Sequence, residues 1–121
     1  MEYSGYNDKY RDRTKKFAVE IIHFYAENCK KTDELRIIGK QLLRSGTSVA
    51  ANFRAFTRGR SEAEKLSKLC VVLEEADETE FWLELIEEAK LIDIAKFAHI
   101  TKEANELVKI FSTTRATMRK Q

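Results

Sequence analysis

The sequence is short of the residues that interrupt helices or build catalytic centres. Its 121 residues include no proline, four glycines, two cysteines and two histidines. Proline and glycine stop or weaken helices, so their scarcity favours long helices. Cys29 and Cys70 are single and lack the spacing of metal ligands. The pattern predicts two buried thiols in a reducing cytosol and neither a disulfide nor a zinc site.

Long apolar runs are also missing. No stretch approaches the roughly 20 apolar residues that a membrane span needs. The first residues, Met1–Tyr6, lack the apolar core of a secretory signal peptide. We therefore expect a cytoplasmic protein with no membrane contact. The length fits one domain over residues 1–121.

Charge of one overall sign is nearly absent, since the formal net charge is only +2. The two halves differ, however: residues 1–60 carry 13 Lys and Arg against 7 Asp and Glu, and residues 61–121 carry 9 against 13. One interpretation pairs a basic helical hairpin with an acidic one, within a chain or between subunits. The other is a dedicated nucleic-acid face.

What is abundant is helical apolar spacing. We predict helices over residues 10–29, 33–58 and 61–91, and a fourth from the break at Ile92–Asp93 to about residue 113. Ser61 and Glu64 form a capping box before the third of these. Residues 1–10 are expected to be a loose arm and residues 113–121 a frayed basic tail. Long helices joined by short turns predict an all-α, up-down-up-down antiparallel four-helix bundle.

The stretch from Arg44 to Ala55 carries small residues where a plain core helix would carry Leu or Ile. Gly46 costs about 1 kcal/mol relative to Ala inside a helix, which is tolerable if another helix approaches there; a kink is the competing explanation. A ridge of small residues accompanies it, and it predicts either packing within the chain or a subunit interface: Ser45, Ser48, Ala51 and Ala55. Trp82 is expected in the core or at an interface.

Eight carboxylates lie between Glu74 and Glu88. A di-iron bundle would add Glu-x-x-His motifs, which are absent, so we expect a solvated face and no metal. Glu80 is the exception because it follows the apolar seam. We expect it to pair with Arg44 or Arg54, beside Asn52, in a structural polar network.

One group of cations lies around the turn near residue 60, and it forms the candidate phosphate contact: Arg54, Arg58, Arg60, Lys65 and Lys68. Cations also favour the carboxyl end of a helix for electrostatic reasons alone. The sequence has no Gly-rich phosphate loop and no Ser/His/Asp or Cys/His set. It therefore predicts no catalytic residue, no cofactor and no small-molecule substrate.

Two blocks carry a family resemblance. Residues 41–55, QLLRSGTSVAANFRA, and residues 74–85, EEADETEFWLEL, resemble the small bacterial four-helix-bundle proteins called 23S rRNA intervening-sequence proteins. The resemblance covers about residues 15–112. Where many members have a Glu-Gly pair after the Asn, this chain has Ala55 and Phe56.

The resemblance implies a left-handed bundle that assembles as a ring-like homopentamer. It also implies a fold similar to the accessory variability protein of diversity-generating retroelements, a basic pentamer that binds nucleic acid. We do not extend the ribosomal-protein label of some members to this chain. The leading hypothesis is a non-enzymatic protein that binds RNA or a nucleic-acid-processing protein. The alternatives are a protein-interaction scaffold without nucleic-acid affinity and, third, a carboxylate-rich metalloenzyme.

Overall fold

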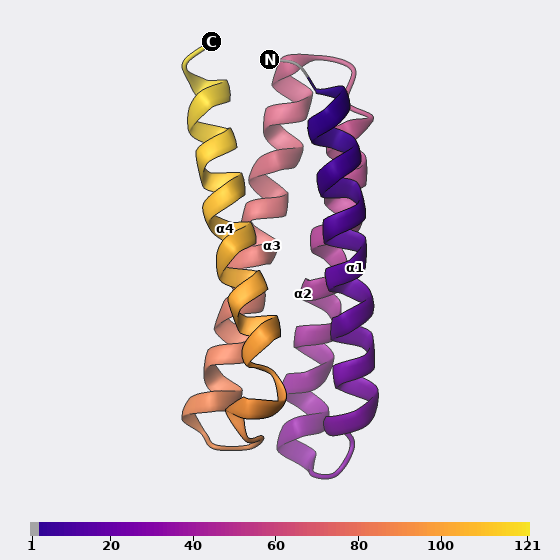
Figure 1. The fold of residues 1–121 in the computed structure, drawn as a ribbon, viewed down its shortest axis with the longest axis vertical. Helices are drawn as coiled ribbons and strands as arrows, with labels where there is room; N and C mark the ends of the chain where they lie inside the picture. The colour runs from indigo at the N-terminus through magenta and orange to yellow at the C-terminus, as the bar shows by residue number, and fades with distance from the viewer. Residues whose placement is uncertain (1–2) are drawn as a thin grey trace.

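Four long helices make up most of the computed structural model, which describes residues 3–121. The helices are α1 (Ser4–Asn28), α2 (Asp33–Thr57), α3 (Glu62–Glu88) and α4 (Ala98–Arg119), and a 3-10 turn at Ile94–Lys96 precedes α4. They run alternately down and up, so that helices adjacent in sequence are antiparallel (Figure 1). The prediction of an all-α four-helix bundle is therefore confirmed.

Helix α1 begins six residues earlier than predicted, so the expectation of a loose arm over residues 1–10 is wrong from Ser4 onward. Residues 1 and 2 lie outside the described residues. The reason for the early start is a stripe of tyrosines, Tyr3, Tyr6 and Tyr10, which pack partly buried against the core. Tyrosine buries its ring while its hydroxyl reaches a polar partner, so a stretch that looks polar in sequence still has an apolar helical face.

Helix α4 continues to Arg119, so the predicted frayed tail over residues 113–121 is also wrong. Thr114 and Met118 are buried, and with Phe111 they extend the apolar face by two further turns. The Thr114 hydroxyl donates to the carbonyl of Ile110 at 3.0 Å and so needs no solvent. The last helical turns are therefore held by packing.

Side-chain caps set the helix starts. Thr32 accepts a hydrogen bond from the amide of Leu35 at 3.2 Å, and Ser61 accepts one from the amide of Glu64 at 3.0 Å. Each bond satisfies one of the orphan amides of a helix N-terminus. The predicted role of Ser61 is confirmed, and the turns between the helices stay short.

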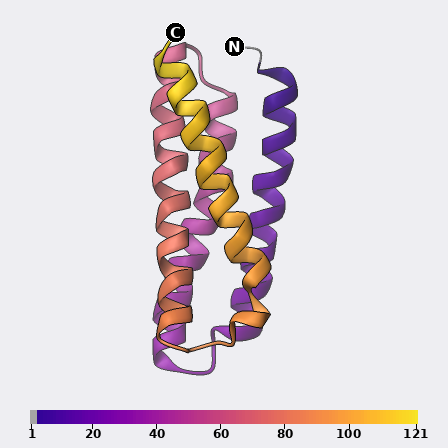
Figure 2. The ribbon, with the colours of Figure 1, turned by 60° about the vertical axis from the view of Figure 1, so that its left-hand side comes forward.

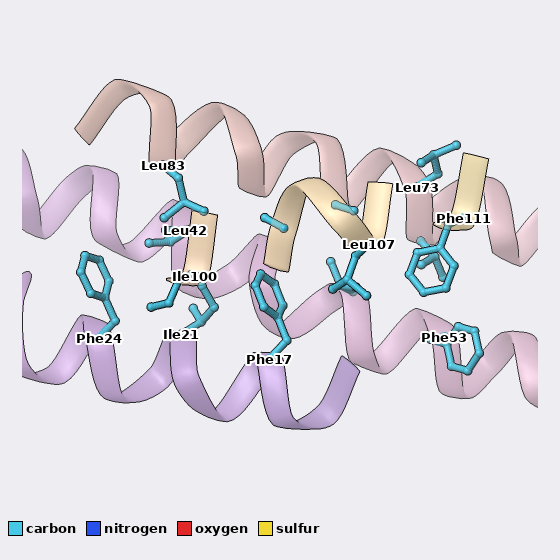
Figure 3. Close-up of a cluster of buried hydrophobic side chains, with 14 of the residues drawn as sticks. Phe17, Ile21, Phe24, Leu42, Phe53, Leu73, Leu83, Ile100, Leu107 and Phe111 are labelled. Carbon is cyan, nitrogen blue, oxygen red and sulfur yellow. The ribbon is translucent and has the colours of Figure 1, made fainter. Parts of the chain in front are cut away.

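All four helices contribute large side chains to one continuous core. Figure 3 shows these side chains converging from the four ribbons. The largest of the fully buried ones are Phe17, Phe53, Phe56, Phe97, Phe111, Ile21, Leu42, Leu69, Leu83, Ile86, Ile100 and Leu107. Each contributes about 1.5–3 kcal/mol through burial, which makes this core the main source of stability.

Glycine brings α1 and α2 close together. A β-carbon added at Gly46 would lie 2.9 Å from Cγ1 of Ile21, and one added at Gly39 would lie 2.6 Å from Cβ of Cys29. Real side chains do not approach that closely, so any larger residue at Gly46 must push α1 away. The close-approach explanation for Gly46 is confirmed, although the partner is α1.

Helices α1 and α4 meet in a different way. Figure 2 shows α4 running obliquely, beside α3 at the end with the chain termini and toward α1 at the other end. Long side chains span this seam: Arg13 donates two hydrogen bonds of 2.7 Å to Glu103 and one of 2.6 Å to Glu106. Near the termini, the Tyr6 hydroxyl lies 2.7 Å from that of Thr114.

None of the helices within residues 3–121 combines the length and the apolar character that crossing a membrane requires.

Candidate nucleic-acid interface

The turn between α2 and α3 presents two exposed residues of the predicted phosphate contacts. Arg58 caps the end of α2 and is exposed, and the Arg60 side chain is 90% exposed. The Arg60 guanidinium lies 3.8 Å from the Glu64 carboxylate. An exposed pair of this kind contributes little energy, so Arg60 can exchange Glu64 for another anion at little cost.

Lys65 is held across the turn. It lies over Gly59, where a β-carbon would be 2.5 Å from Cγ of Lys65. Its Nζ is 4.2 Å from the ring centre of Tyr3, whose hydroxyl donates to Glu62 at 2.7 Å. Burial, followed by the bond to Glu62, raises the pKa of Tyr3 to about 12, so this ring stays neutral. The cation–π contact holds the ammonium group beside the turn.

The end of α4 brings three cations to the same end of the bundle. Residues 112–121 contain Arg115, Arg119 and Lys120 and no Asp or Glu. Arg119 Nη2 lies 3.9 Å from Sγ of Cys70, two residues after Lys68 on α3. Figure 1 shows the C-terminus and the α2–α3 turn at this end. Sequence reasoning assigned these cations to a frayed basic tail and not to the candidate phosphate contact, although Phe111, Thr114 and Met118 continue the helical spacing that would have placed them.

These cations lie toward one end of the bundle, and we call them together the basic end: Arg58, Arg60, Lys65, Lys68, Arg115, Arg119 and Lys120. Arg115 also lines a hollow with Glu74 and Asp77 of α3. Residues 58–68 and 112–121 carry these seven cations against two carboxylates, Glu62 and Glu64. Five of the seven come from residues 61–121, the half of the sequence with the acidic excess, so the charge difference between the two halves does not explain this end. It is built from the α2–α3 turn and from parts of α3 and α4.

Arg54 is separate from the other predicted phosphate contacts. It lines a hollow between α1 and α2 together with Arg11, Lys15 and the small residues Ala50 and Ala51. Asp12 is the one carboxylate in this lining. The structure therefore divides the predicted cluster into four residues at the basic end and one on the α1–α2 face.

Arg44 belongs to a polar network, as predicted, but its carboxylate partners are not the predicted Glu80. Arg44 binds Glu75, at 3.3 Å, and Glu78 on α3. The indole of Trp82 also donates to Glu78, at 3.0 Å. The Trp82 hydrogen bond and the charge of Arg44 lower the pKa of Glu78. This cluster joins α2 to α3 at the surface.

Glu80 does not take part in that network, and the prediction that Arg44 or Arg54 pairs with it is wrong. The residue that faces α2 is its neighbour Thr79, which is fully buried. Glu80 is half-buried; burial, together with the charges of Asp77 and Glu84, raises its pKa. Asn52, the third expected member, donates to the carbonyl of Ser48 on its own helix at 2.9 Å.

The small-residue ridge divides between the interior and the surface. Ser45 is fully buried and accepts a 3.0 Å hydrogen bond from the Thr79 hydroxyl on α3. Ser48 and Ala55 are half-buried, and Ala51 is exposed in the hollow lined by Arg54. Packing within the chain therefore accounts for Ser45 and leaves Ala51 uncovered.

No metal-binding cluster of three or more His, Cys, Asp or Glu side chains is found within residues 3–121. His99 lies 3.8 Å from Glu20 across the α1–α4 groove, and His23 lines the same groove. Both histidines are exposed. Nothing in this part of the geometry indicates catalysis.

Comparison with known proteins places this geometry in a family. The sequence model for the 23S rRNA-intervening sequence proteins matches residues 8–113. A crystal structure from Bacteroides thetaiotaomicron, described as a protein of unknown function from the S23 ribosomal protein family, is 32% identical with a TM-score of 0.80. The alignment covers 91% of this chain and 97% of the other. No match was found among curated proteins.

Proposed function

Because the chain belongs to the family of 23S rRNA-intervening sequence proteins, we propose that it is a non-enzymatic protein that binds RNA through the basic end. The observation that carries the proposal is that residues 58–68 and 112–121 hold seven cations and two carboxylates. Figure 1 shows that these two segments lie at the same end of the bundle. A cluster of this sign attracts the phosphate backbone and releases counterions when it binds.

The expected contacts are to phosphates. Arg58 and Arg60 present planar guanidinium groups, which match phosphate oxygens in pairs. Tyr3, the aromatic residue at this end, is already engaged by Lys65 and packs edge-on against Phe56 at 5.9 Å. Lys65 therefore occupies one face of this ring, and we infer recognition mainly of the RNA backbone, with little dependence on sequence.

The direct test is the affinity for a labelled RNA hairpin, measured by fluorescence anisotropy over a range of salt concentrations. The variant Arg58→Glu/Arg60→Glu should weaken binding at least tenfold, on the order of what two lost phosphate contacts cost. It should also flatten the dependence of affinity on salt. The matched control is Lys31→Glu/Lys102→Glu, which makes the same charge change at exposed positions of the opposite end.

Equal weakening in the two variants would mean that net charge alone drives binding, and the proposal would fail. An affinity that does not fall as salt rises would also contradict it. A parallel check is the ratio of absorbance at 260 and 280 nm after purification without nuclease. RNA that copurifies and is released by high salt supports the proposal.

We further propose that the protein self-associates as a homopentamer, as the resemblance to the family implies. Small exposed residues such as Ala51, and charged faces of opposite sign on one chain, support self-association. Size exclusion with light scattering tests it. A single-chain mass at every concentration would overturn it, without bearing on RNA binding by the monomer.

The alternative function is a protein-interaction scaffold with no affinity for nucleic acid. The observation in its favour is the exposed aromatic ring of Phe81 on the acidic face of α3. A scaffold tolerates Arg58→Glu/Arg60→Glu without loss of its partner, whereas an RNA-binding protein loses RNA. The same pair of variants therefore separates the two.

A further inference from the structure

The outer face of α3 carries an aromatic ring inside a ring of negative charge. Phe81 is 48% exposed, which is unusual for a side chain that gains so much from burial. One helical turn away, Glu78 and Leu85 are half-buried. The other positions one and two turns away include four exposed carboxylates: Glu74, Asp77, Glu84 and Glu88. We call Phe81 and these four residues the acidic ridge.

Phe81 is held in a defined position. Its ring contacts the ring of Trp82 edge to face, with 4.9 Å between centres. Trp82 is fixed by its 3.0 Å hydrogen bond to Glu78, which Arg44 also binds. An aromatic side chain braced in this way loses little conformational entropy when a partner covers it. Rigid aromatic residues of this kind often act as anchors of protein interfaces.

A hollow lined mainly by small and positively charged residues lies on another face of the same chain. The hollow between α1 and α2 has a volume of about 210 Å³ and is floored by Ala50 and Ala51. An apolar cavity of about 150 Å³ accommodates benzene, so this hollow has room for a phenyl ring. Three cations, Arg11, Lys15 and Arg54, line it together with one carboxylate, Asp12. Farther along α1, Val19 and Ile22 are 43% and 44% exposed, which continues an apolar strip beyond the hollow.

The two features cannot meet within one bundle. Helix α3 packs against α2 and α4, and α1 lies diagonally across from it. The acidic ridge is on the solvent side of α3, whereas the hollow is on the solvent side of α1 and α2. Their complementarity is therefore available only to separate molecules.

We propose that the acidic ridge of one copy docks onto the α1–α2 hollow of a second copy, with Phe81 seated on Ala50 and Ala51. The carboxylates around Phe81 then face Arg11, Lys15 and Arg54. The inference rests on the self-association proposed above and assigns it a surface. The cations around Ala50 and Ala51 attract the carboxylates around Phe81. The same charges fix how the two copies align, because other alignments would bring like charges together.

The contact is heterologous, because the two partners use different surfaces. Each copy that donates its ridge still has an empty hollow, so the contact repeats until a ring closes. Thr79 and Ser45 are level, since they share a hydrogen bond. Phe81 therefore lies roughly 10 Å from the level of the hollow along the bundle axis, at 1.5 Å per residue. Neighbouring copies must be inclined or displaced relative to one another.

The interface leaves most of the basic end uncovered. Arg54 belongs to the α1–α2 hollow, and Arg115 lines another hollow beside Glu74 and Asp77 of the acidic ridge. Arg58 and Arg60 lie in the α2–α3 turn, outside both surfaces, so self-association leaves them accessible to RNA. A ring would bring several basic ends to one rim and increase the affinity for a long RNA.

The experiment is charge reversal followed by restoration, with mass measured by light scattering. Glu84→Lys/Glu88→Lys reverses the ridge, and Lys15→Glu/Arg54→Glu reverses the rim of the hollow. Each double variant should shift dissociation to at least tenfold higher protein concentration. The quadruple variant, in which both surfaces are reversed, should recover the oligomer. Recovery distinguishes docking from misfolding, because four substitutions would not repair a fold that two had broken.

Two further variants test the apolar part. Phe81→Ala should weaken association at high salt, where the charges are screened, and Ala51→Phe should fill the hollow and block it. The control Glu27→Lys/Glu34→Lys reverses exposed carboxylates far from both surfaces and should leave the mass unchanged.

The outcomes separate this inference from the proposals on which it rests. A monomeric wild-type protein overturns self-association and this interface together. An oligomer that survives both reversals overturns this interface alone. If Lys15→Glu/Arg54→Glu lowers the affinity for the RNA hairpin and leaves the mass unchanged, the hollow binds phosphate, and the docking proposal is wrong.

Discussion

Helix α1 is held to its two neighbours by opposite means. Where α1 meets α2, helix α2 has glycines in place of side chains: Ile21 packs onto Gly46, and Cys29 packs onto Gly39. Against α4 the side chains are long, and Arg13 reaches Glu103 and Glu106 across the seam. The α1–α2 seam thus requires small residues, and the α1–α4 seam requires large side chains. Adding side-chain volume should therefore destabilise the first seam, whereas removing it should destabilise the second.

The largest effect is expected from removing volume at the α1–α4 seam. Phe111 is fully buried and contacts Tyr10 and Phe53, with ring centres at 5.9 and 5.4 Å. Phe111→Ala should lower the free energy of unfolding by about 3–5 kcal/mol, since it leaves a cavity that helices cannot close without moving. Denaturation in urea measures this. A loss below 1 kcal/mol would mean that α4 collapses onto α1.

The next effect comes from adding volume at the α1–α2 seam. Gly46→Leu should lower the free energy of unfolding by about 1–3 kcal/mol through overpacking against Ile21. The control is Gly5→Leu, because a β-carbon at Gly5 meets nothing within 4 Å. That control should instead be neutral or stabilising, since leucine favours the helix more than glycine does. A neutral Gly46→Leu would show that the two helices can separate freely.

A smaller effect is expected for the ion pairs of the α1–α4 seam. The Arg13 side chain is 27% exposed, and it binds one carboxylate with two nitrogens and a second with one of them. Arg13→Met should cost about 1–2 kcal/mol, because charge-assisted, partly buried bonds exceed ordinary surface pairs. Arg36→Met, which breaks an exposed pair with Asp33, should change stability by less than about 0.5 kcal/mol. Equal losses in chemical denaturation would contradict the distinction.

The smallest expected effect is a difference in the pH at which a residue of each seam ceases to stabilise the fold. Burial raises the pKa of Cys29, at the α1–α2 seam, from 9.0 to about 11, and that of Tyr6, at the α1–α4 seam, from 10.0 to about 12. Both groups fold in their neutral form, so their contribution to stability is complete below the unfolded pKa. It is lost as the pH rises through the folded pKa. Cys29 should act over pH 9–11 and Tyr6 over pH 10–12.

Melting temperatures between pH 8 and 12 measure this difference. Cys29→Ala should delay the alkaline decline to higher pH, and Tyr6→Phe should flatten its upper part. Tyr3, whose pKa is also raised to about 12, adds to the upper part in both variants. If neither substitution changes the fall in melting temperature at high pH, neither Cys29 nor Tyr6 is its cause.

The sequence predicted the elements that depend on simple periodicity. Four helices, the Ser61 cap and the close approach at Gly46 follow from spacing and from the conformational cost of glycine. The outer ends of α1 and α4 were predicted to be unfolded because Tyr6 and Thr114 carry hydroxyl groups. Both side chains nevertheless pack against the core. Those hydroxyls satisfy one another across the α1–α4 seam at 2.7 Å, which no local pattern reveals.

The pairing of Glu80 was predicted wrongly for another reason. Apolar residues surround much of this helix, so Thr79 and Glu80 were equally plausible on the core face. The tertiary partner decides: Ser45 on α2 has a hydroxyl for Thr79 at 3.0 Å, and Arg44 finds Glu75 and Glu78 at the rim. Likewise, the helical end of α4 places Arg115 and Arg119 at the basic end, where sequence reasoning had expected a frayed tail.

The antiparallel topology with an even number of helices has a practical consequence. Both Ser4 and Arg119 lie at the same end of the bundle as the α2–α3 turn (Figure 1). Any affinity tag, fluorescent protein or surface tether joined to either terminus therefore emerges beside Arg58 and Arg60 and shields them sterically. Labels intended for interaction assays belong in the opposite loops, near Lys31 or Asp93, where an inserted peptide leaves that end accessible.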